Sequence, residues 1–180
     1  MREQFGVNGM TEEETNLNIT LKVQKLLEES GATVLLTRSD ENAIYDLDKE
    51  TLREKKVSDI KNRARIGNEA QADIFVSIHL NKGDSDKYNG WQTFYRNDDE
   101  NGKRLAECIQ ESIGESVKTD NHRKAHDISN VYLIENVEIP ISIVECGFLS
   151  NPQEGQQLLS DDYQNKLAWG IYNGILKYFN

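Results

Sequence analysis

The stretch Phe75-Val76-Ser77-Ile78-His79-Leu80-Asn81 decides the fold class of this chain. It is an apolar run that ends in a histidine and an asparagine, and the polar residues 82–85 follow it. Such a run is typical of a strand that is buried in a parallel sheet. Because open α/β sheets bind their ligands at the carboxyl ends of the strands, His79 is the first candidate for a functional residue.

Helical and strand patterns alternate on both sides of this stretch. The rhythm predicts one domain with a three-layer α/β sandwich, in which helices flank a mostly parallel, twisted sheet. The apolar spacing predicts helices over about 11–29, 51–70, 100–117, 152–159 and 161–179, and further strands over 33–37, 90–95, 131–134 and 141–144.

Composition excludes several classes of protein. The chain has 180 residues and a formal net charge of −10, which argues against nucleic acid as a partner because phosphate contacts need clustered Lys and Arg. No apolar run approaches the roughly 20 residues of a membrane span. The first dozen residues lack the apolar core of a signal peptide, so we expect any export signal to have been removed or to lie outside this chain. Cys108 and Cys146 have no metal-binding spacing and are expected to be buried.

A second strand end carries a candidate side chain. Glu145 follows the apolar run 141–144, and it would converge with His79 if the two strands are parallel neighbours. Each residue alone also has an ordinary structural explanation, as a hydrogen-bonded histidine or a solvated glutamate at the rim. The residues by themselves therefore indicate no more than a metal site or an acid/base site.

The chain resembles a known family in several motifs. Ala72–Asn81 is similar to the segment "AD-F-V-S-I-H-x-N" of the zinc-dependent N-acetylmuramoyl-L-alanine amidases (the Amidase_3 group), and Val144–Pro152 resembles their "V-E-x-G-F-L-S-N-P". Tyr163–Ile175 resembles their closing helix. Shorter matches, in chain order, are Asn8-Gly9, Glu12, Asn16-Leu17, Leu36-Thr37-Arg38, Arg63 and Asn68. Within the family, Gly90–Tyr95 and Asn130–Leu133 most resemble the germination-specific amidases of spore-forming bacteria.

The resemblance implies a zinc hydrolase and assigns its residues. Glu12 and His79 would be zinc ligands, and Glu145 would be the catalytic general base. A catalytic zinc lowers the pKa of a water towards about 7 and polarises the scissile carbonyl. Glu145 would take the proton of this water and pass it to the departing L-alanine amine.

Three further residues match family positions with a less definite role. Arg38 and Arg63 are either structural or substrate-binding, and the structural role is favoured. Asn81 is expected to fix the loop or to support the ligands, and it is a further candidate for substrate binding.

The chain departs from the family pattern at its start. The resemblance implies a first zinc-ligand histidine, in a "D-P-G-H-G-G" loop at the end of a strand upstream of Glu12, yet residues 1–11 contain no histidine. His122 and His126 are alternative ligands, although a weak match. We therefore expect residues 1–180 to form a single amidase catalytic domain that is N-terminally incomplete, with Met1 an internal or misassigned start.

Two functions stay open at this point. The first is a peptidoglycan hydrolase that cleaves the amide between N-acetylmuramic acid and L-alanine with zinc-activated water. By resemblance it would act outside the cytoplasm, in spore cortex maturation with formation of muramic-δ-lactam, and could need an activator protein. The second is an inactive, truncated domain that only binds peptidoglycan. The presence of Glu145 favours the enzyme, because a binding domain needs no general base.

Overall fold

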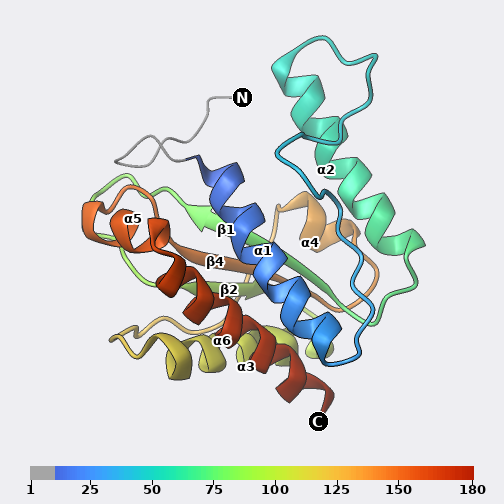
Figure 1. Cartoon of the computed structure of the whole chain (residues 1–180). Coiled ribbons are helices and arrows are strands. Elements are labelled where there is room, and N and C mark those ends of the chain that lie inside the picture. The colour runs from blue at the N-terminus through green and yellow to red at the C-terminus, as the bar shows by residue number, and fades with distance from the viewer. Residues whose placement is uncertain (1–10) are drawn as a thin grey trace.

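Residues 11–180 are described by the computed structural model, and a sheet between two layers of helices organises them (Figure 1). The strand order is β1-β4-β2-β3. The elements along the chain are α1 (Glu12–Glu29), α2 (Leu52–Glu69), β1 (Phe75–Asn81), β2 (Gln92–Tyr95), α3 (Glu100–Val117), β3 (His126–Asp127), α4 (Tyr132–Asn136), β4 (Ile141–Phe148), α5 (Pro152–Leu159) and α6 (Asp161–Phe179).

The predicted α/β fold is confirmed, and its sheet is mixed. Strand β1 pairs with β4 in parallel and β2 pairs with β3 in parallel, but β2 and β4 are antiparallel. The chain reaches β2 from β1 through the loop 82–91, which contains no helix. A parallel return within one sheet usually needs a helical crossover, so this short loop explains why β2 runs in the opposite direction.

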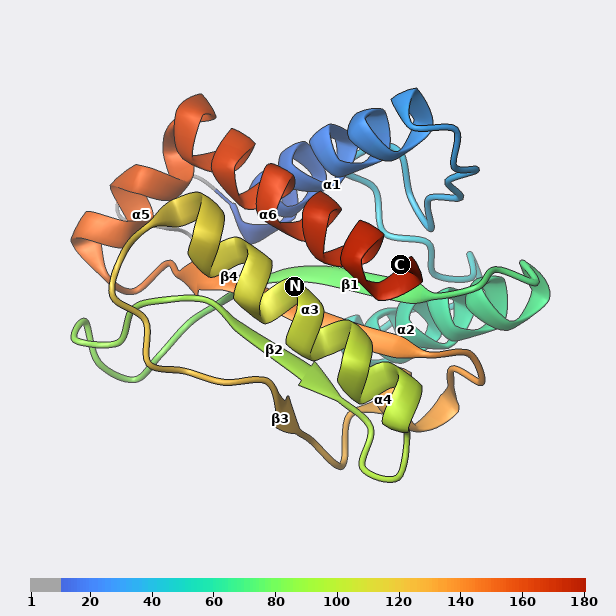
Figure 2. The same cartoon turned by 90° about the horizontal axis from the view of Figure 1, so that it is seen from below.

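Two apolar cores lie on the two faces of the sheet. The larger core joins α1, α3 and α6 to one face, and the smaller core joins α2 and α4 to the other (Figure 2). Because strand side chains alternate between faces, Val144 and Cys146 enter the larger core while Ile141 and Ile143 enter the smaller one. Glu145 shares the face of Ile143, and His79 shares the face of Phe75, which packs against the smaller core. The two candidate residues therefore lie on the same face.

Local signals explain where the helices begin. The Thr11 hydroxyl accepts a hydrogen bond from the Glu14 backbone N–H, and Thr51 and Glu54 form a complete capping box at α2. Asn151 caps α5, whose first residue is Pro152. The predicted helix boundaries are confirmed to within a residue or two. Among residues 11–180, no helix is both long enough and apolar enough to cross a membrane.

Two strand predictions are wrong. Residues 33–37 form no strand, because no strand of residues 11–180 lies beside them to complete a ladder. Residues 131–134 belong mostly to helix α4, in which Leu133 and Ile134 are buried. A short apolar run does not distinguish a strand from a buried helical turn. Here the turn starts after Asn130, which has a positive φ of 62° and donates its backbone N–H to the Glu135 carboxylate.

Candidate active site

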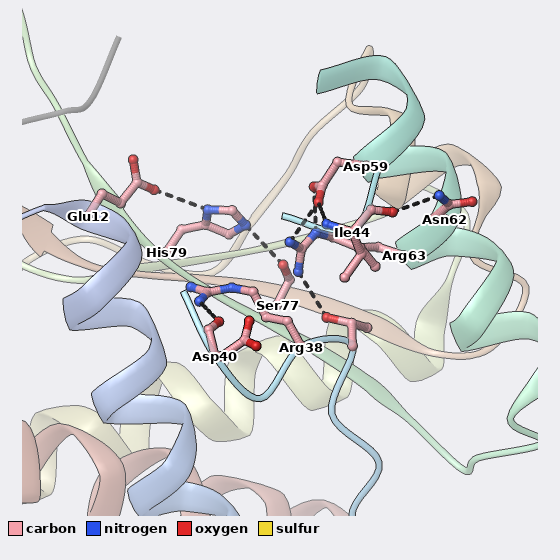
Figure 3. A network of polar contacts seen from close by, with 10 residues as sticks. Glu12, Arg38, Asp40, Ile44, Asp59, Asn62, Arg63, Ser77 and His79 are labelled. Atoms are coloured by element: carbon pink, nitrogen blue, oxygen red, sulfur yellow. Dashed lines mark hydrogen bonds and ion pairs between the residues drawn. The ribbon is translucent and has the colours of Figure 1, made fainter. Parts of the chain in front are cut away.

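Three acidic or imidazole side chains meet at the carboxyl end of β1 and β4. His79 lies directly opposite Glu145 in the parallel register of these strands. Glu12 reaches the same place from the first turn of α1, and its Oε1 lies 3.3 Å from His79 Nδ1 (Figure 3). The structure thus brings together the three residues predicted to be ligands and base.

Both nitrogens of His79 have a polar neighbour. Nδ1 faces Glu12, and Nε2 lies 3.0 Å from the hydroxyl of Ser77, two residues earlier on the same face of β1. In the tautomer with the proton on Nε2, the ring donates to Ser77 and presents the Nδ1 lone pair towards Glu12. The side chain of His79 is 41% exposed, so the ring is accessible to a ligand.

The start of α1 holds the Glu12 carboxylate in place. Asn16, one turn later, donates its Nδ2–H to Glu12 Oε1 at 3.3 Å. The free N–H groups at a helix N-terminus also favour a negative charge in the first turn. With 16% of its side chain exposed, Glu12 is more enclosed than His79.

Glu145 is a half-buried glutamate with an altered pKa. Burial raises the pKa of this group to about 6, while the charge of His79 lowers it and that of Glu12 raises it further. One of its oxygens, Oε2, is buried without a hydrogen-bond partner in the described part of the chain. A buried polar atom without a partner is uncommon in native proteins and points to a missing water, ion or substrate group.

The donors suit zinc in type and spacing. Carboxylate oxygen and imidazole nitrogen bind zinc at about 2.0–2.1 Å, so two ligand atoms of a tetrahedral site lie about 3.3–3.4 Å apart. The separation of 3.3 Å between Glu12 Oε1 and His79 Nδ1 agrees with that edge. Residues 11–180 nevertheless contain no cluster of three His, Cys, Asp or Glu side chains that could hold a metal ion. The described site thus fits a zinc ion with two protein ligands.

Arg38 and Arg63 are engaged by the protein itself. Arg38 donates to the backbone carbonyls of Glu13 and Asp40 at 2.7 and 2.6 Å. Arg63 forms a two-pronged ion pair with Asp59 and donates to the Thr37 hydroxyl at 2.9 Å (Figure 3). These contacts tie α2 and the loop after α1 together, in line with a structural role. A role of either arginine in substrate binding stays a prediction.

The remaining predicted candidates lie further from the cluster of Glu12, His79 and Glu145, which we call the centre. Asn81 is the last residue of β1, beyond an irregularity in the register, and its carbonyl accepts from the Leu149 N–H. His126 lies on β3, separated from β1 by two strands, and His122 is exposed in the preceding loop. Neither histidine belongs to the cluster around His79 in the described structure.

Three residues of this region escaped sequence analysis. Ser77 could have been found, because a residue two positions before His79 on a strand shares its face. Gln92 lies opposite Glu145 in the antiparallel register with β2. Glu154 is 6% exposed and accepts hydrogen bonds from the backbone N–H groups of Gly90 and Phe148 at 2.8 and 2.7 Å. No sequence spacing indicates the positions of Gln92 and Glu154, because only the sheet and the loop packing bring them here.

Comparison with known proteins finds relatives over almost the whole chain. The family model Amidase_3, N-acetylmuramoyl-L-alanine amidase, matches residues 3–177. The germination-specific N-acetylmuramoyl-L-alanine amidase of Bacillus subtilis is 34% identical over 170 residues, which cover 94% of this chain and 71% of that protein. The N-acetylmuramoyl-L-alanine amidase LytC of the same organism is 33% identical over 174 residues, which cover 96% of this chain and 32% of that protein.

Solved structures agree with the fold. The CwlD amidase of Clostridioides difficile, solved in complex with the GerS lipoprotein, superposes with a TM-score of 0.94 and 41% identity, covering 98% of this chain and 91% of that one. The catalytic domain of the amidase CwlV from Bacillus (Paenibacillus) polymyxa var. colistinus superposes with a TM-score of 0.82 and 28% identity, covering 97% and 89%.

Proposed function

This chain belongs to the N-acetylmuramoyl-L-alanine amidase family of peptidoglycan hydrolases, and we propose that it cleaves the amide between N-acetylmuramic acid and L-alanine with the help of a zinc ion. The observation that carries this proposal is the arrangement of Glu145. Its buried carboxylate lies opposite His79 in the sheet, and His79 in turn contacts Glu12. This arrangement supports a role of Glu145 as the general base beside a pair of zinc-type donors.

Glu12 and His79 would hold the zinc ion. When bound there, zinc would polarise the scissile carbonyl and lower the pKa of the attacking water, because it acts as a Lewis acid. Ser77 would orient the ring of His79 through its hydrogen bond to Nε2, the outer contact that ligating histidines usually have.

Glu145 would move the proton. Its carboxylate accepts a proton from water as the water oxygen bonds to the lactyl carbonyl carbon. The same carboxyl group then donates that proton to the nitrogen of L-alanine as the C–N bond breaks. The products are a free lactyl carboxylate on the sugar and a peptide with a free amino terminus. Burial raises the pKa of Glu145, which suits a carboxyl group that has to accept a proton and then return it.

Catalytic zinc usually has three protein ligands, and within residues 11–180 the site offers two of them, Glu12 and His79. We propose that a third ligand comes from outside these residues.

We further propose an extracytoplasmic role in spore cortex maturation. Support comes from the 34% identity to a germination-specific amidase and the 41% identity to an amidase solved with a lipoprotein. We propose a lipoprotein activator for this chain on the basis of that complex. The chemistry agrees, because muramic-δ-lactam can form only after the lactyl group has lost its peptide. Deleting the gene should remove muramic-δ-lactam from the cortex. The wild-type gene should restore it, and a Glu145→Gln gene should not.

A digestion assay separates the enzyme from a domain that only binds peptidoglycan. Purified peptidoglycan is incubated with the zinc-loaded protein in its native length, and new L-alanine amino termini are labelled and counted. The wild type should release them, and Glu145→Gln should be slower by about 10²–10⁴-fold, the usual contribution of a general base. A wild-type protein that sediments with peptidoglycan but releases no L-alanine amino termini would support the binding domain instead.

A further inference from the structure

An arginine is linked to Glu145 through one intervening side chain. Glu145 on β4 faces Gln92 on β2, and directly opposed residues of antiparallel strands share one face. The Gln92 side chain in turn accepts a hydrogen bond from Arg123 Nη1 at 3.2 Å. Arg123 belongs to the loop that leads from α3 into β3 (Figure 2). Gln92 thus lies between Glu145 and Arg123, on the side of β4 away from β1.

The protein holds the guanidinium of Arg123 in one position. Its Cζ lies 5.0 Å from the centroid of the Phe148 ring, and its Nε donates to the Asn89 carbonyl at 3.2 Å. The backbone of Arg123 is fixed too, because its carbonyl accepts from the side chain of Gln110 at 3.0 Å. A planar guanidinium that stacks on a ring and is bonded at its edge has already lost much of its freedom before a ligand binds.

Arg123 has no carboxylate partner in residues 11–180. Arg63, Arg65 and Arg96 all form ion pairs with Asp or Glu, whereas Arg123 forms none, and its Nη2 makes no hydrogen bond there. Glu154 lies near enough for the charge of Arg123 to lower its pKa, but both of its oxygens already accept backbone N–H groups. A half-buried guanidinium therefore has an unused Nη2 edge next to Gln92.

The substrate of the proposed reaction carries a matching group. The lactyl carboxyl of the sugar is tied up in the scissile amide, so free carboxylates occur only on the peptide. The first of them belong to the second residue, about 7 Å from the scissile carbonyl in an extended chain. Gln92 is about one strand spacing, roughly 5 Å, from Glu145, and Arg123 lies just beyond it. Arginine binds carboxylates with paired hydrogen bonds.

We propose that Arg123 binds a free carboxylate of the peptide stem and so directs the peptide across β2 towards β3. This inference rests on the proposed function, because it takes the muramoyl peptide as substrate. It assigns the glycan to the other side of Glu145, and it makes Arg123 a specificity residue that selects an acidic second residue over its amide.

Binding of two synthetic probes tests the inference without catalysis. The probes are N-acetylmuramoyl-L-alanyl-D-glutamate and its diamide, and their affinities are measured by calorimetry with the full chain in EDTA. The wild type should prefer the acid. Arg123→Gln should weaken binding of the acid about 10-fold and change binding of the diamide less than twofold. Arg123→Lys keeps the charge but not the paired N–H groups of the guanidinium. Its affinity for the acid should therefore lie between those of the wild type and Arg123→Gln.

Arg104→Gln is the matched control. Arg104 also stacks on an aromatic ring, 4.5 Å from the centroid of Tyr178, and donates to a carbonyl without an ion pair in the described chain. It lies on α3, which covers the opposite face of the sheet, so its loss should leave both affinities unchanged. Equal affinities of wild type and Arg123→Gln for the acid, or equal losses for both probes, would overturn the role of Arg123 while leaving the proposed function intact. A wild type that binds neither probe in EDTA would also overturn the role of Arg123, whereas the proposed function is decided separately by the digestion assay with the zinc-loaded protein.

Discussion

The carboxylate of Glu12 and the imidazole of His79 lie 3.3 Å apart, although 67 positions separate them in the chain. One is held by the first turn of a helix and the other by the end of a strand, and both elements are anchored in the larger core. Neither residue depends on a flexible loop for its position. The proposed zinc site would therefore be largely formed before the metal binds, so we expect single side chains to be removable without unfolding the domain.

Removal of the imidazole should abolish zinc binding. Loss of a hydrogen-bond partner of a ligating residue usually weakens zinc affinity roughly 10–100-fold. In the native-length protein, His79→Ala should weaken it by more than this, because a direct ligand is lost. Competition with a chromophoric chelator measures the affinity. His126→Ala is the control, since that exposed histidine lies on β3. Equal losses in both variants would show that His79 is not a ligand.

Ser77→Ala should have a smaller effect on the same measurement. The hydroxyl contacts only the second nitrogen of His79, so its loss frees the ring to rotate but removes no ligand. We expect zinc affinity to fall roughly 10–100-fold. An unchanged affinity would mean that the strand alone orients the ring.

The charge of Glu145 should destabilise the metal-free protein. Burial raises the pKa of this carboxyl from 4.5 to about 6, so the folded state holds its proton more tightly than the unfolded state does. The bound proton therefore stabilises the folded state fully below pH 4.5, and this stabilisation is lost as the pH rises to 6 and above. A shift of this size corresponds to about 2 kcal/mol.

Urea denaturation in EDTA reveals this effect. The free energy of unfolding of Glu145→Gln relative to wild type should rise by about 2 kcal/mol between pH 4 and pH 7.5. Glu138→Gln, at an exposed position, should show no such change. If the difference between Glu145→Gln and wild type were independent of pH, the burial of an ionised Glu145 would be disproved.

Glu154 should be essential for the loops around the centre. Its two oxygens accept the N–H groups of Gly90 and Phe148, which are inside the protein. Glu154→Ala leaves both donors without an acceptor, and each such group costs about 1–3 kcal/mol. Glu154→Gln keeps one acceptor and should lose less. Thermal denaturation of Glu154→Ala and Glu154→Gln, with Glu138→Ala as the control, measures these losses of stability. A Glu154→Ala protein as stable as Glu138→Ala would contradict the prediction.

Two glycines of α6 should tolerate no side chain. A Cβ at Gly170 would lie 2.6 Å from the Ile113 Cα, and one at Gly174 would lie 2.5 Å from the Ile109 Cα. Because these neighbours are backbone atoms of α3, either Ala variant should lose about 1–3 kcal/mol or more.

Gly114→Ala provides the matched control on α3. Its Cβ would meet only the Trp91 ring, at 3.5 Å, an ordinary contact. Here the higher helix propensity of alanine should stabilise the protein by up to about 1 kcal/mol. Urea denaturation of the three variants gives the comparison, and a stable Gly174→Ala protein would refute the close approach of α3 and α6.

Local sequence signals predicted every helix of residues 11–180 except α4, and part of the site. Thr11 before α1 and Asn151-Pro152 at α5 are signals that act within one turn, so they can be read without the fold. The pairing of His79 with Glu145 follows from two strand ends and the parallel register. The contact of Glu12 with either of them does not follow from any spacing, and only the family resemblance implied it.

Non-local packing explains the errors. Thr33–Thr37 has the composition of a strand, but a strand exists only where another strand pairs with it, and residues 11–180 supply none. The antiparallel direction of β2 depends on the short loop before it. Gln92 lies opposite Glu145, and Arg123 bonds to Gln92, only because β2 and the loop into β3 fold back beside β4. No pattern of neighbouring residues encodes this arrangement.

Product analysis tests the central claim most directly. The zinc-loaded protein in its native length is incubated with N-acetylmuramoyl-L-alanyl-D-glutamate in ¹⁸O-labelled water, and the products are identified by mass spectrometry. The account predicts N-acetylmuramic acid with one ¹⁸O in its lactyl carboxylate, together with unlabelled L-alanyl-D-glutamate, and no reaction in EDTA. Cleavage at another bond, or the same cleavage undiminished by EDTA, would contradict it.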